Sequence, residues 1–194
     1  MLFNDKRIVI IATVGRTFLF FRGLGEQLRS HSWIPLAFAS EDGFFNKFCK
    51  EEGFTPYSIS LKRRITPLAD SISLLKLWFK LIHIQPKIVH AHTPKAGLVG
   101  MVAACLARVP VRLYTVHGVP LETATGLRFF LLWLSDCIAF VCATDLLCVS
   151  HSVKAKIQQL NLPRARKARV LLEGTACGVD AVSYTHLTLP TKVT

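Results

Sequence analysis

Polar side chains that can bind anions or stabilise developing charge follow short apolar segments at several points of the sequence. A histidine can give up or take a proton near neutral pH, and a glycine beside a helix N-terminus lets free N–H groups approach an anion. These residue types indicate a site for a phosphorylated or otherwise anionic substrate. The candidate substrate-contacting residues are Gly15, Arg16, His92, Thr93, Lys95, His117, Gly118, Ser150 and His151.

His117 is the candidate for a catalytic role. It follows a predicted strand in the segment YTVHG, where we expect Gly118 to permit a sharp turn that leaves the imidazole facing a cleft. A partial positive charge at that place would assist the departure of an anionic group. The alternative is a histidine at a strand end whose hydrogen bonds are satisfied within the fold.

The other candidates also have plainer interpretations. The Gly15-Arg16 loop is either an anion site or an ordinary tight turn, and Lys95 is either a phosphate contact or a solvated lysine. Ser150 and His151 either face a substrate or open a helix as its cap.

His90 and His92 alternate along a predicted strand, so both should face the same side of a sheet. An HxH pair can bind a metal ion, but no third ligand is evident beside it. The six cysteines lie mostly in apolar segments and form no pair of CxxC motifs, which disfavours zinc. We therefore expect no metal and no cofactor, with both histidines packed in the core or in a cleft wall.

The familiar nucleotide and hydrolase signatures are missing from the sequence. Gly23-Leu24-Gly25 is a GxG, but Leu28 occupies the position of the third glycine. The motifs GxxxxGK[ST] and GxSxG do not occur. These observations argue against a Rossmann dehydrogenase, a P-loop NTPase and a hydrolase with a nucleophile elbow.

The candidate residues need a scaffold that brings the ends of several strands together. Short apolar runs predict strands at 7–12, 33–39, 57–61, 87–91, 111–116, 146–149 and 169–172. Helical spacing predicts helices at 17–30, 43–52, 68–84, 95–108, 126–142 and 152–160. This alternation indicates an α/β fold with a Rossmann-like, doubly wound and mostly parallel sheet. Ligands bind beyond the carboxyl ends of such strands, where the candidates lie.

Local signals mark the ends of three of these helices. Thr66-Pro67 and Thr93-Pro94 predict hydroxyl-capped helix N-termini with proline in the first turn. Gly53 predicts a helix C-cap.

The composition fits one folded domain with a basic surface. The chain has 194 residues, 51% of them hydrophobic, and a formal net charge of +12. Between Gly53 and Leu121, nine bases stand against a single acid, Asp70. Such a field attracts nucleic acid, an anionic membrane or phosphorylated substrates, and charge alone does not choose among them.

One basic segment has the amphipathic character of a helix at a bilayer surface. Within residues 61–87, apolar residues recur at helical spacing beside basic ones, and the sequence includes a tryptophan. The alternative is a helix that packs on the sheet and has a solvated basic edge. The candidate membrane contacts are Lys62, Arg63, Arg64, Lys76, Trp78 and Lys80.

The sequence offers neither a signal peptide nor a clear membrane span. Residues 1–7 lack the apolar region of a secretory signal, so we expect a cytoplasmic location. The apolar run 127–149 is interrupted by charged residues, so it predicts a buried helix followed by a strand.

Three segments together resemble a known family. They are IVHAHTPKAGLVGMVAACLARVPVRLYTVHGVP (residues 88–120), LLCVSHSVK (146–154) and GVD (178–180). The pattern resembles the N-terminal domain of family-4 glycosyltransferases of the GT-B fold. Within that family it looks like the bacterial enzymes that assemble capsule, exopolysaccharide or O-antigen repeats.

The resemblance implies the acceptor-side half of a two-domain enzyme. Such enzymes transfer a sugar from a nucleotide-sugar donor with retention of configuration and without a metal. The implied acceptor is a polyprenyl diphosphate-linked saccharide, and the implied location is peripheral, at the inner face of the cell membrane. His117 matches a family histidine near the donor sugar, and Gly15 matches a loop close to the diphosphate or acceptor. No nucleic-acid partner is implied.

The resemblance covers about residues 5 to 181. We expect residues 1–181 to form the family domain, and 182–194 (VSYTHLTLPTKVT) to be a non-native tail read from a sequencing adapter. We expect this sequence to lack the C-terminal donor-binding domain that the resemblance implies, and the fragment alone to lack turnover. The alternatives are a sugar-nucleotide epimerase of the same fold, or a basic membrane-binding or nucleic-acid-binding module without catalysis.

Overall fold

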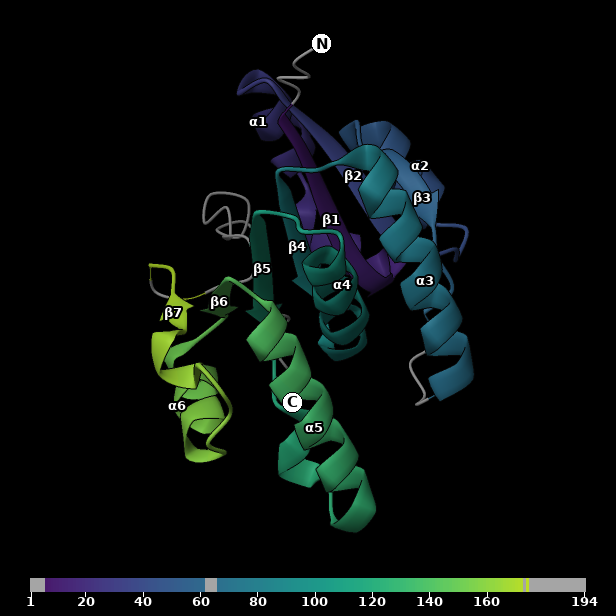
Figure 1. Cartoon of the computed structure of the whole chain (residues 1–194). Coiled ribbons are helices and arrows are strands. Elements are labelled where there is room, and N and C mark those ends of the chain that lie inside the picture. Colours follow the sequence, from purple (N-terminus) through teal and green to yellow (C-terminus); the bar gives the residue numbers. More distant parts are fainter. Residues whose placement is uncertain (1–5, 62–65, 173, 175–194) are drawn as a thin grey trace, which may run out of the picture.

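A parallel sheet of seven strands runs through the computed structural model, which describes residues 6–61, 66–172 and 174 (Figure 1). The strand order is β3-β2-β1-β4-β5-β6-β7, and all six neighbouring pairs are parallel. The predicted Rossmann-like, doubly wound sheet is therefore confirmed. The strands are β1 (Lys6–Val14), β2 (Trp33–Ser40), β3 (Thr55–Ser58), β4 (Ile88–His92), β5 (Val111–Val116), β6 (Asp145–Cys148) and β7 (Arg169–Val170).

Helices cover both faces of the sheet in the described part of the chain. The α-helices are α1 (Leu24–Ser30), α2 (Phe45–Glu52), α3 (Pro67–Ile84), α4 (Pro94–Leu106), α5 (Gly126–Cys142) and α6 (His151–Gln159). Three short 3₁₀ helices are η1 (Gly15–Phe21), η2 (Pro120–Thr123) and η3 (Ala165–Lys167). The apolar run 127–149 forms the predicted helix and strand, α5 and β6, but α5 is not the buried helix expected, since Leu127, Phe130 and Val141 are more than half exposed. None of the helices described is long and apolar enough to cross a bilayer.

The core has two parts because the side chains of β1 alternate across the sheet. Val9 and Ile11 pack on the side of α3, α4 and α5, which lie in front of the sheet in Figure 1. Ile10 and Ala12 pack on the opposite side against the aromatic residues of η1 and α2. A strand buried on both faces reads as a continuous apolar run, which is why RIVIIA was recognisable in the sequence.

One predicted helix is divided. The segment 17–30 is not a single α-helix: η1 ends at Phe21, and α1 begins after Gly23, whose φ is 76°. The Gly23 N–H donates to the Glu52 carboxylate at 2.7 Å. A 3₁₀ helix has about three residues per turn, so Phe18 and Phe21 lie on one side and both enter the core.

Two smaller predictions are also corrected. Strand β3 occupies Thr55–Ser58 rather than 57–61, since the N–H of Leu61 donates to the Ser40 hydroxyl at 2.7 Å and leaves the ladder. Thr66 and Thr93 precede helices with proline in the first turn, but neither hydroxyl caps its helix. Gly53 is confirmed as a C-cap with φ 72°.

Several predictions lie outside the described residues. These are the basic residues Lys62, Arg63 and Arg64, the GVD segment 178–180, the domain boundary at 181 and the tail 182–194.

Candidate functional site

The loops singled out in the sequence meet where the strand order reverses. From β1 the chain winds outward to β2 and β3, whereas β4 and the later strands lie on the other side of β1. Doubly wound sheets bind ligands at this switch point, beyond the carboxyl ends of the strands. The hydroxyls of Thr13, near the end of β1, and Thr93, just after β4, lie 2.6 Å apart, and their hydrogen bond joins the ends of the two strands.

Thr93 has a backbone conformation that L-residues rarely adopt. Its φ is 73° and its ψ 147°, a region that costs about 1–3 kcal/mol for a residue other than glycine. The Thr93 hydroxyl is hydrogen-bonded to the Thr13 hydroxyl. This bond explains why the Thr93 hydroxyl does not cap α4. Strain of this kind gathers at functional sites, so Thr93 supports this edge of the sheet as the site.

Three histidines from adjacent strands contact one another beside Thr93. Nδ1 of His92 lies 2.9 Å from Nε2 of His117, and Nε2 of His90 lies 2.7 Å from the Thr115 hydroxyl. The His90 and His92 ring centroids are 4.0 Å apart. Because His92 pairs with Thr115 in the sheet register, these four side chains form one cluster. The prediction that His90 and His92 share a face is confirmed.

His92 has a different position from the one predicted for a substrate contact. Its side chain has no exposed surface, and Phe21 packs edge to face against it at 4.5 Å. Nε2 of His92 is buried without a hydrogen-bond partner. In this structure His92 therefore lies beneath the site, and His117 stands between it and the surface.

Burial keeps the histidine cluster neutral. It lowers the pKa of His117, and with the nearby His117 it lowers the pKa of His90 to about 3. Burial and the charges of His90 and His117 bring the pKa of His92 well below its usual range. The three rings are uncharged at pH 7, so any positive potential at His117 comes from an N–H dipole rather than an imidazolium.

His117 is partly exposed and Gly118 is exposed. The φ of Gly118 lies outside the left-handed region and a Cβ placed on it would meet open space, so neither backbone conformation nor crowding requires glycine here. The ring of Phe20, more than half exposed, lies 6.1 Å from the His117 ring. The surface above His117 is thus open and has an aromatic edge.

Gly15 and Arg16 begin η1 rather than form a loop, and they already lie against a carboxylate. The N–H of Arg16 donates to Oδ2 of Asp42 at 3.2 Å, and Oδ1 of Asp42 accepts from Phe45 N–H at 3.1 Å. A Cβ on Gly15 would lie 2.4 Å from that Oδ1, so the close approach requires glycine. The Asp42 carboxylate therefore accepts a hydrogen bond from the Arg16 N–H that we expected to bind a phosphate group. An anionic ligand at Arg16 N–H would have to displace it.

Lys95, another predicted phosphate contact, forms an ion pair with Asp70. Its ammonium lies 2.9 Å from both carboxylate oxygens of Asp70, and the two side chains are 13% and 18% exposed. Asp70 in addition accepts from the Thr66 hydroxyl at 3.1 Å, which explains why Thr66 does not cap α3. The lone acid of this basic stretch thus joins the starts of α3 and α4.

Ser150 and His151 lie one strand beyond His117. The end of β6 is tied to β5 by the N–H of Val149, which donates to the Val116 carbonyl. The Ser150 hydroxyl accepts from Val153 N–H at 3.2 Å and caps α6, while His151 is exposed. The capping interpretation therefore describes Ser150, and His151 faces solvent at the same edge.

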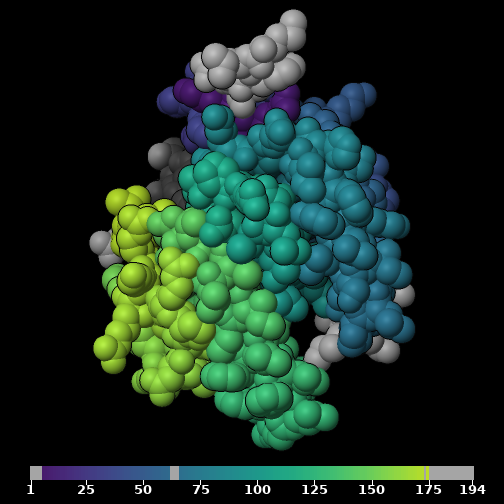
Figure 2. Space-filling model, in the orientation of Figure 1, coloured from purple at the N-terminus to yellow at the C-terminus, as the bar shows by residue number. Residues whose placement is uncertain are grey.

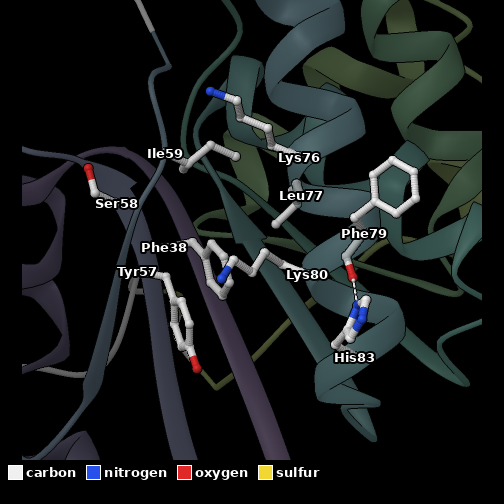
Figure 3. Close-up of a pocket in the computed structure, with 9 residues that line it drawn as sticks. All are labelled: Phe38, Tyr57, Ser58, Ile59, Lys76, Leu77, Phe79, Lys80 and His83. Atoms are coloured by element: carbon white, nitrogen blue, oxygen red, sulfur yellow. Dashed lines mark hydrogen bonds between the residues drawn. The ribbon is translucent and has the colours of Figure 1, made fainter.

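The predicted membrane contacts of α3 do not lie on one face. Trp78 packs toward the core, whereas Lys76 and Lys80 are exposed. Lys80 lies 5.5 Å from the centre of the Tyr57 ring, beside a cavity of about 520 Å³ between α3 and β3 (Figure 3). The apolar side of α3 that faces solvent is formed by other residues and not by Trp78. These residues, the outer apolar row of α3, are Leu68, Ile72, Leu75, Phe79 and Ile82, which are 85%, 55%, 49%, 55% and 41% exposed.

A second, apolar groove of about 490 Å³ separates α3 from α5, with α4 at its floor (Figure 2). Aliphatic side chains dominate its lining, among them Leu74, Leu98, Val102 and Leu131. Asp136 also lines it, and burial raises the pKa of this carboxyl to about 6. The groove reaches Pro120, three residues after His117.

Sequence reasoning missed the acids that organise the site. Asp42 follows the carboxyl end of β2, so the rule that selected the other loops would have found it. Asp70 was noticeable as the only acid in its stretch, but its pairing with Lys95 depends on the packing of α3 against α4. Across the described residues, no group of three potential metal ligands is arranged to hold a metal ion.

Comparisons with known proteins agree with this architecture. The family model Glycosyltransferase Family 4 matches residues 20–175. The chain is 36% identical over 177 residues to the Staphylococcus aureus capsular polysaccharide biosynthesis glycosyltransferase CapM, covering 91% of this chain and 46% of CapM. It is 33% identical over 124 residues to the Escherichia coli UDP-Gal:alpha-D-GlcNAc-diphosphoundecaprenol alpha-1,3-galactosyltransferase, covering 56% of this chain and 31% of that protein. The chain therefore spans less than half the length of these relatives.

Solved structures share the fold at low identity. Anabaena HepE in complex with UDP and glucose superposes with a TM-score of 0.65 at 16% identity, covering 88% of this chain and 45% of HepE. Staphylococcus aureus MnaA with UDP also gives 0.65 at 16% identity, covering 93% of this chain and 46% of MnaA. The strand order, the family model and the relatives lead to one conclusion: the chain belongs to glycosyltransferase family 4.

Proposed function

We propose that the chain is the acceptor-side domain of a retaining, metal-independent glycosyltransferase. The enzyme moves a sugar from a nucleotide-sugar donor to a lipid-linked saccharide in cell-surface polysaccharide synthesis. The observation that carries the proposal is the 36% identity to CapM across 91% of the chain, which includes the histidine cluster.

The substrate classes follow from what similar proteins bind or act on. HepE was solved with UDP and glucose, which supports a nucleotide-sugar donor. The Escherichia coli relative is named for a diphosphoundecaprenol-linked acceptor, which supports a lipid-linked saccharide here. A lipid chain attached to such an acceptor would have an apolar path in the groove between α3 and α5.

In this mechanism the donor diphosphate leaves as its bond to the sugar breaks. His117 is neutral and partly exposed at the switch point, so it offers a polarised N–H to the oxygens that gain charge. A second domain supplies the remaining donor contacts. The chain by itself should therefore lack turnover.

The first prediction tests the reaction class in the full-length enzyme. Incubated with a labelled nucleotide sugar and a polyprenyl diphosphate-linked sugar, it should transfer the label to the lipid and release nucleoside diphosphate. Lipid extraction and chromatography measure both products. The epimerase alternative predicts a new nucleotide-sugar isomer without any acceptor. Its support is a fold neighbour, a UDP-N-acetylglucosamine 2-epimerase, at TM-score 0.64 and 15% identity. Isomer formation without transfer would overturn the proposal.

We also propose that the enzyme lies at the inner, anionic face of the cell membrane through α3. The outer apolar row of α3 runs beside Lys76 and Lys80, a pattern typical of helices that rest in a bilayer interface. In Figure 3 Phe79 points away from Tyr57, whereas Lys80 reaches over it. Lys62, Arg63 and Arg64 precede this helix in the sequence.

The second prediction concerns this membrane contact. Each lysine near an anionic surface contributes about 1 kcal/mol, so K76Q with K80Q should weaken binding to anionic vesicles about 30-fold in flotation assays. K47Q with K50Q, on α2 at the other side of the sheet, removes the same charge and should change binding little. Salt should release the protein, because the Debye length falls from about 10 Å at 0.1 M to about 3 Å at 1 M. Equal losses in both double variants would contradict the assignment of α3.

A further inference from the structure

We propose that His92 is a positioning residue: its buried hydrogen bond holds the His117 ring and leaves Nδ1–H of His117 as the group presented to the substrate. The proposal rests on the catalytic assignment of His117 made above. It concerns an oxyanion, since an N–H at this place can donate only to an acceptor such as a diphosphate oxygen.

His92 is fixed from several sides. Its ring packs against His90 with centroids 4.0 Å apart and against Phe21 at 4.5 Å, and none of its surface is exposed. His90 is itself anchored to the Thr115 hydroxyl. The nitrogen that His92 offers to His117 therefore has a defined place.

The bond occupies one of the two nitrogens of His117. Nε2 lies 2.9 Å from Nδ1 of His92. Among the described residues, no hydrogen-bond partner is found for Nδ1 of His117, and the residue is partly exposed. Nδ1 is therefore the nitrogen available to a ligand.

The orphaned nitrogen of His92 decides where the protons lie. Two neutral imidazoles joined by one hydrogen bond share a single proton between them. If that proton belonged to His117, the proton of His92 would sit on Nε2, which is buried without a partner. In the opposite tautomer the same Nε2 carries a lone pair instead of a hydrogen, and buried acceptors that lack a partner are more common in folded proteins than orphaned N–H groups. The proton therefore belongs to Nδ1 of His92, His117 accepts it at Nε2, and the His117 proton is on Nδ1.

The arrangement gives His117 one chemical role. Its outward nitrogen carries a hydrogen and cannot take a proton from the acceptor hydroxyl. It can stabilise negative charge as that charge develops. His92 never touches the substrate, yet it determines which nitrogen of His117 does.

The third prediction tests tautomers first. Two-bond ¹H–¹⁵N spectra of the native chain should show His92 and His117 as neutral Nδ1–H tautomers. H92L, which keeps an apolar side chain but removes the bond, should convert His117 to a tautomer mixture. H92N, whose amide nitrogen can take the place of Nδ1, should restore the native tautomer. C49A removes buried atoms at α2 on the same side of the sheet and should leave His117 unchanged.

Activity of the full-length enzyme provides the second readout. H92L should lower kcat about tenfold, by analogy with the loss of a hydrogen bond that orients a metal-bound histidine, with KM for the donor within twofold. H92N should recover most of the loss. An Nε2–H tautomer of His117 in the native chain overturns the proposal, as does a folded H92L variant with unchanged tautomer and kcat. If the expected tautomers appear but H117A is fully active, the catalytic assignment fails and the positioning by His92 stands.

Discussion

Replacing His117 with alanine in the full-length enzyme is expected to lower kcat about 100-fold, equivalent to about 2.7 kcal/mol, the loss typical when one well-placed electrostatic donor is removed. The contribution is larger in the transition state than in the ground state, because charge develops only as the diphosphate departs. KM for the donor should therefore change much less than kcat. Steady-state kinetics with a saturating acceptor measures both constants.

Two isosteric variants sharpen this test. An asparagine amide nitrogen can take the place of Nδ1, whereas a glutamine amide nitrogen takes the place of Nε2. H117N should therefore keep more activity than H117Q if Nδ1–H is the working donor. Unchanged kcat in a well-folded H117A variant would return His117 to an ordinary histidine at a strand end.

The largest effect on stability is expected for Phe18. Its side chain is fully buried, and its ring centroid lies 5.2 to 6.1 Å from the rings of four other phenylalanines, Phe21, Phe45, Phe48 and Phe54. Truncating a buried phenylalanine costs about 3–5 kcal/mol. At about 2–4 °C per kcal/mol for a domain of this size, F18A should lower Tm by roughly 6–20 °C in thermal unfolding.

Phe20 offers a matched control within the same 3₁₀ helix. It is 56% exposed, so F20A should change the free energy of unfolding by no more than about 0.5 kcal/mol. Similar Tm losses in F18A and F20A would contradict the packing of η1, in which Phe18 is buried in the core and Phe20 faces solvent. Because Phe21 of this helix contacts His92, F18A should also loosen the histidine cluster, and the NMR signals of His92 report this directly.

Most of the fold was predictable because each element carries its own periodicity. The pattern predicts strands for RIVIIA (residues 7–12) and VRLYTV (residues 111–116). The first lies in β1 and the second forms β5. The errors arise where distant residues decide the local structure. The division after Phe21 depends on the aromatic residues of α2 and on Glu52, and the end of β3 depends on the hydroxyl of Ser40.

The site was predictable by position but not by contact. Strand ends predicted where His117 would lie, and the structure puts it there. The burial of His92 depends on Phe21, which is 71 residues earlier in the chain. The contacts of the Asp42 and Asp70 carboxylates likewise involve residues that are distant in the sequence. Asp42 accepts from the N–H of Arg16, and Asp70 pairs with Lys95. The strand-end rule could have selected Asp42 by its position after β2, but neither pairing follows from spacing along the sequence.

The central position of β1 has a consequence for synthesis of the protein. Its partner β2 follows soon, but its other edge is covered only by β4, where Ile10 pairs with His90, 80 residues later. At about 5–20 residues per second, a ribosome needs roughly 4–16 s to deliver that partner. During this interval one edge of a strongly apolar strand stays unpaired, and such edges recruit other chains. Slow translation between residues 40 and 88 would lengthen the interval and favour aggregation over folding.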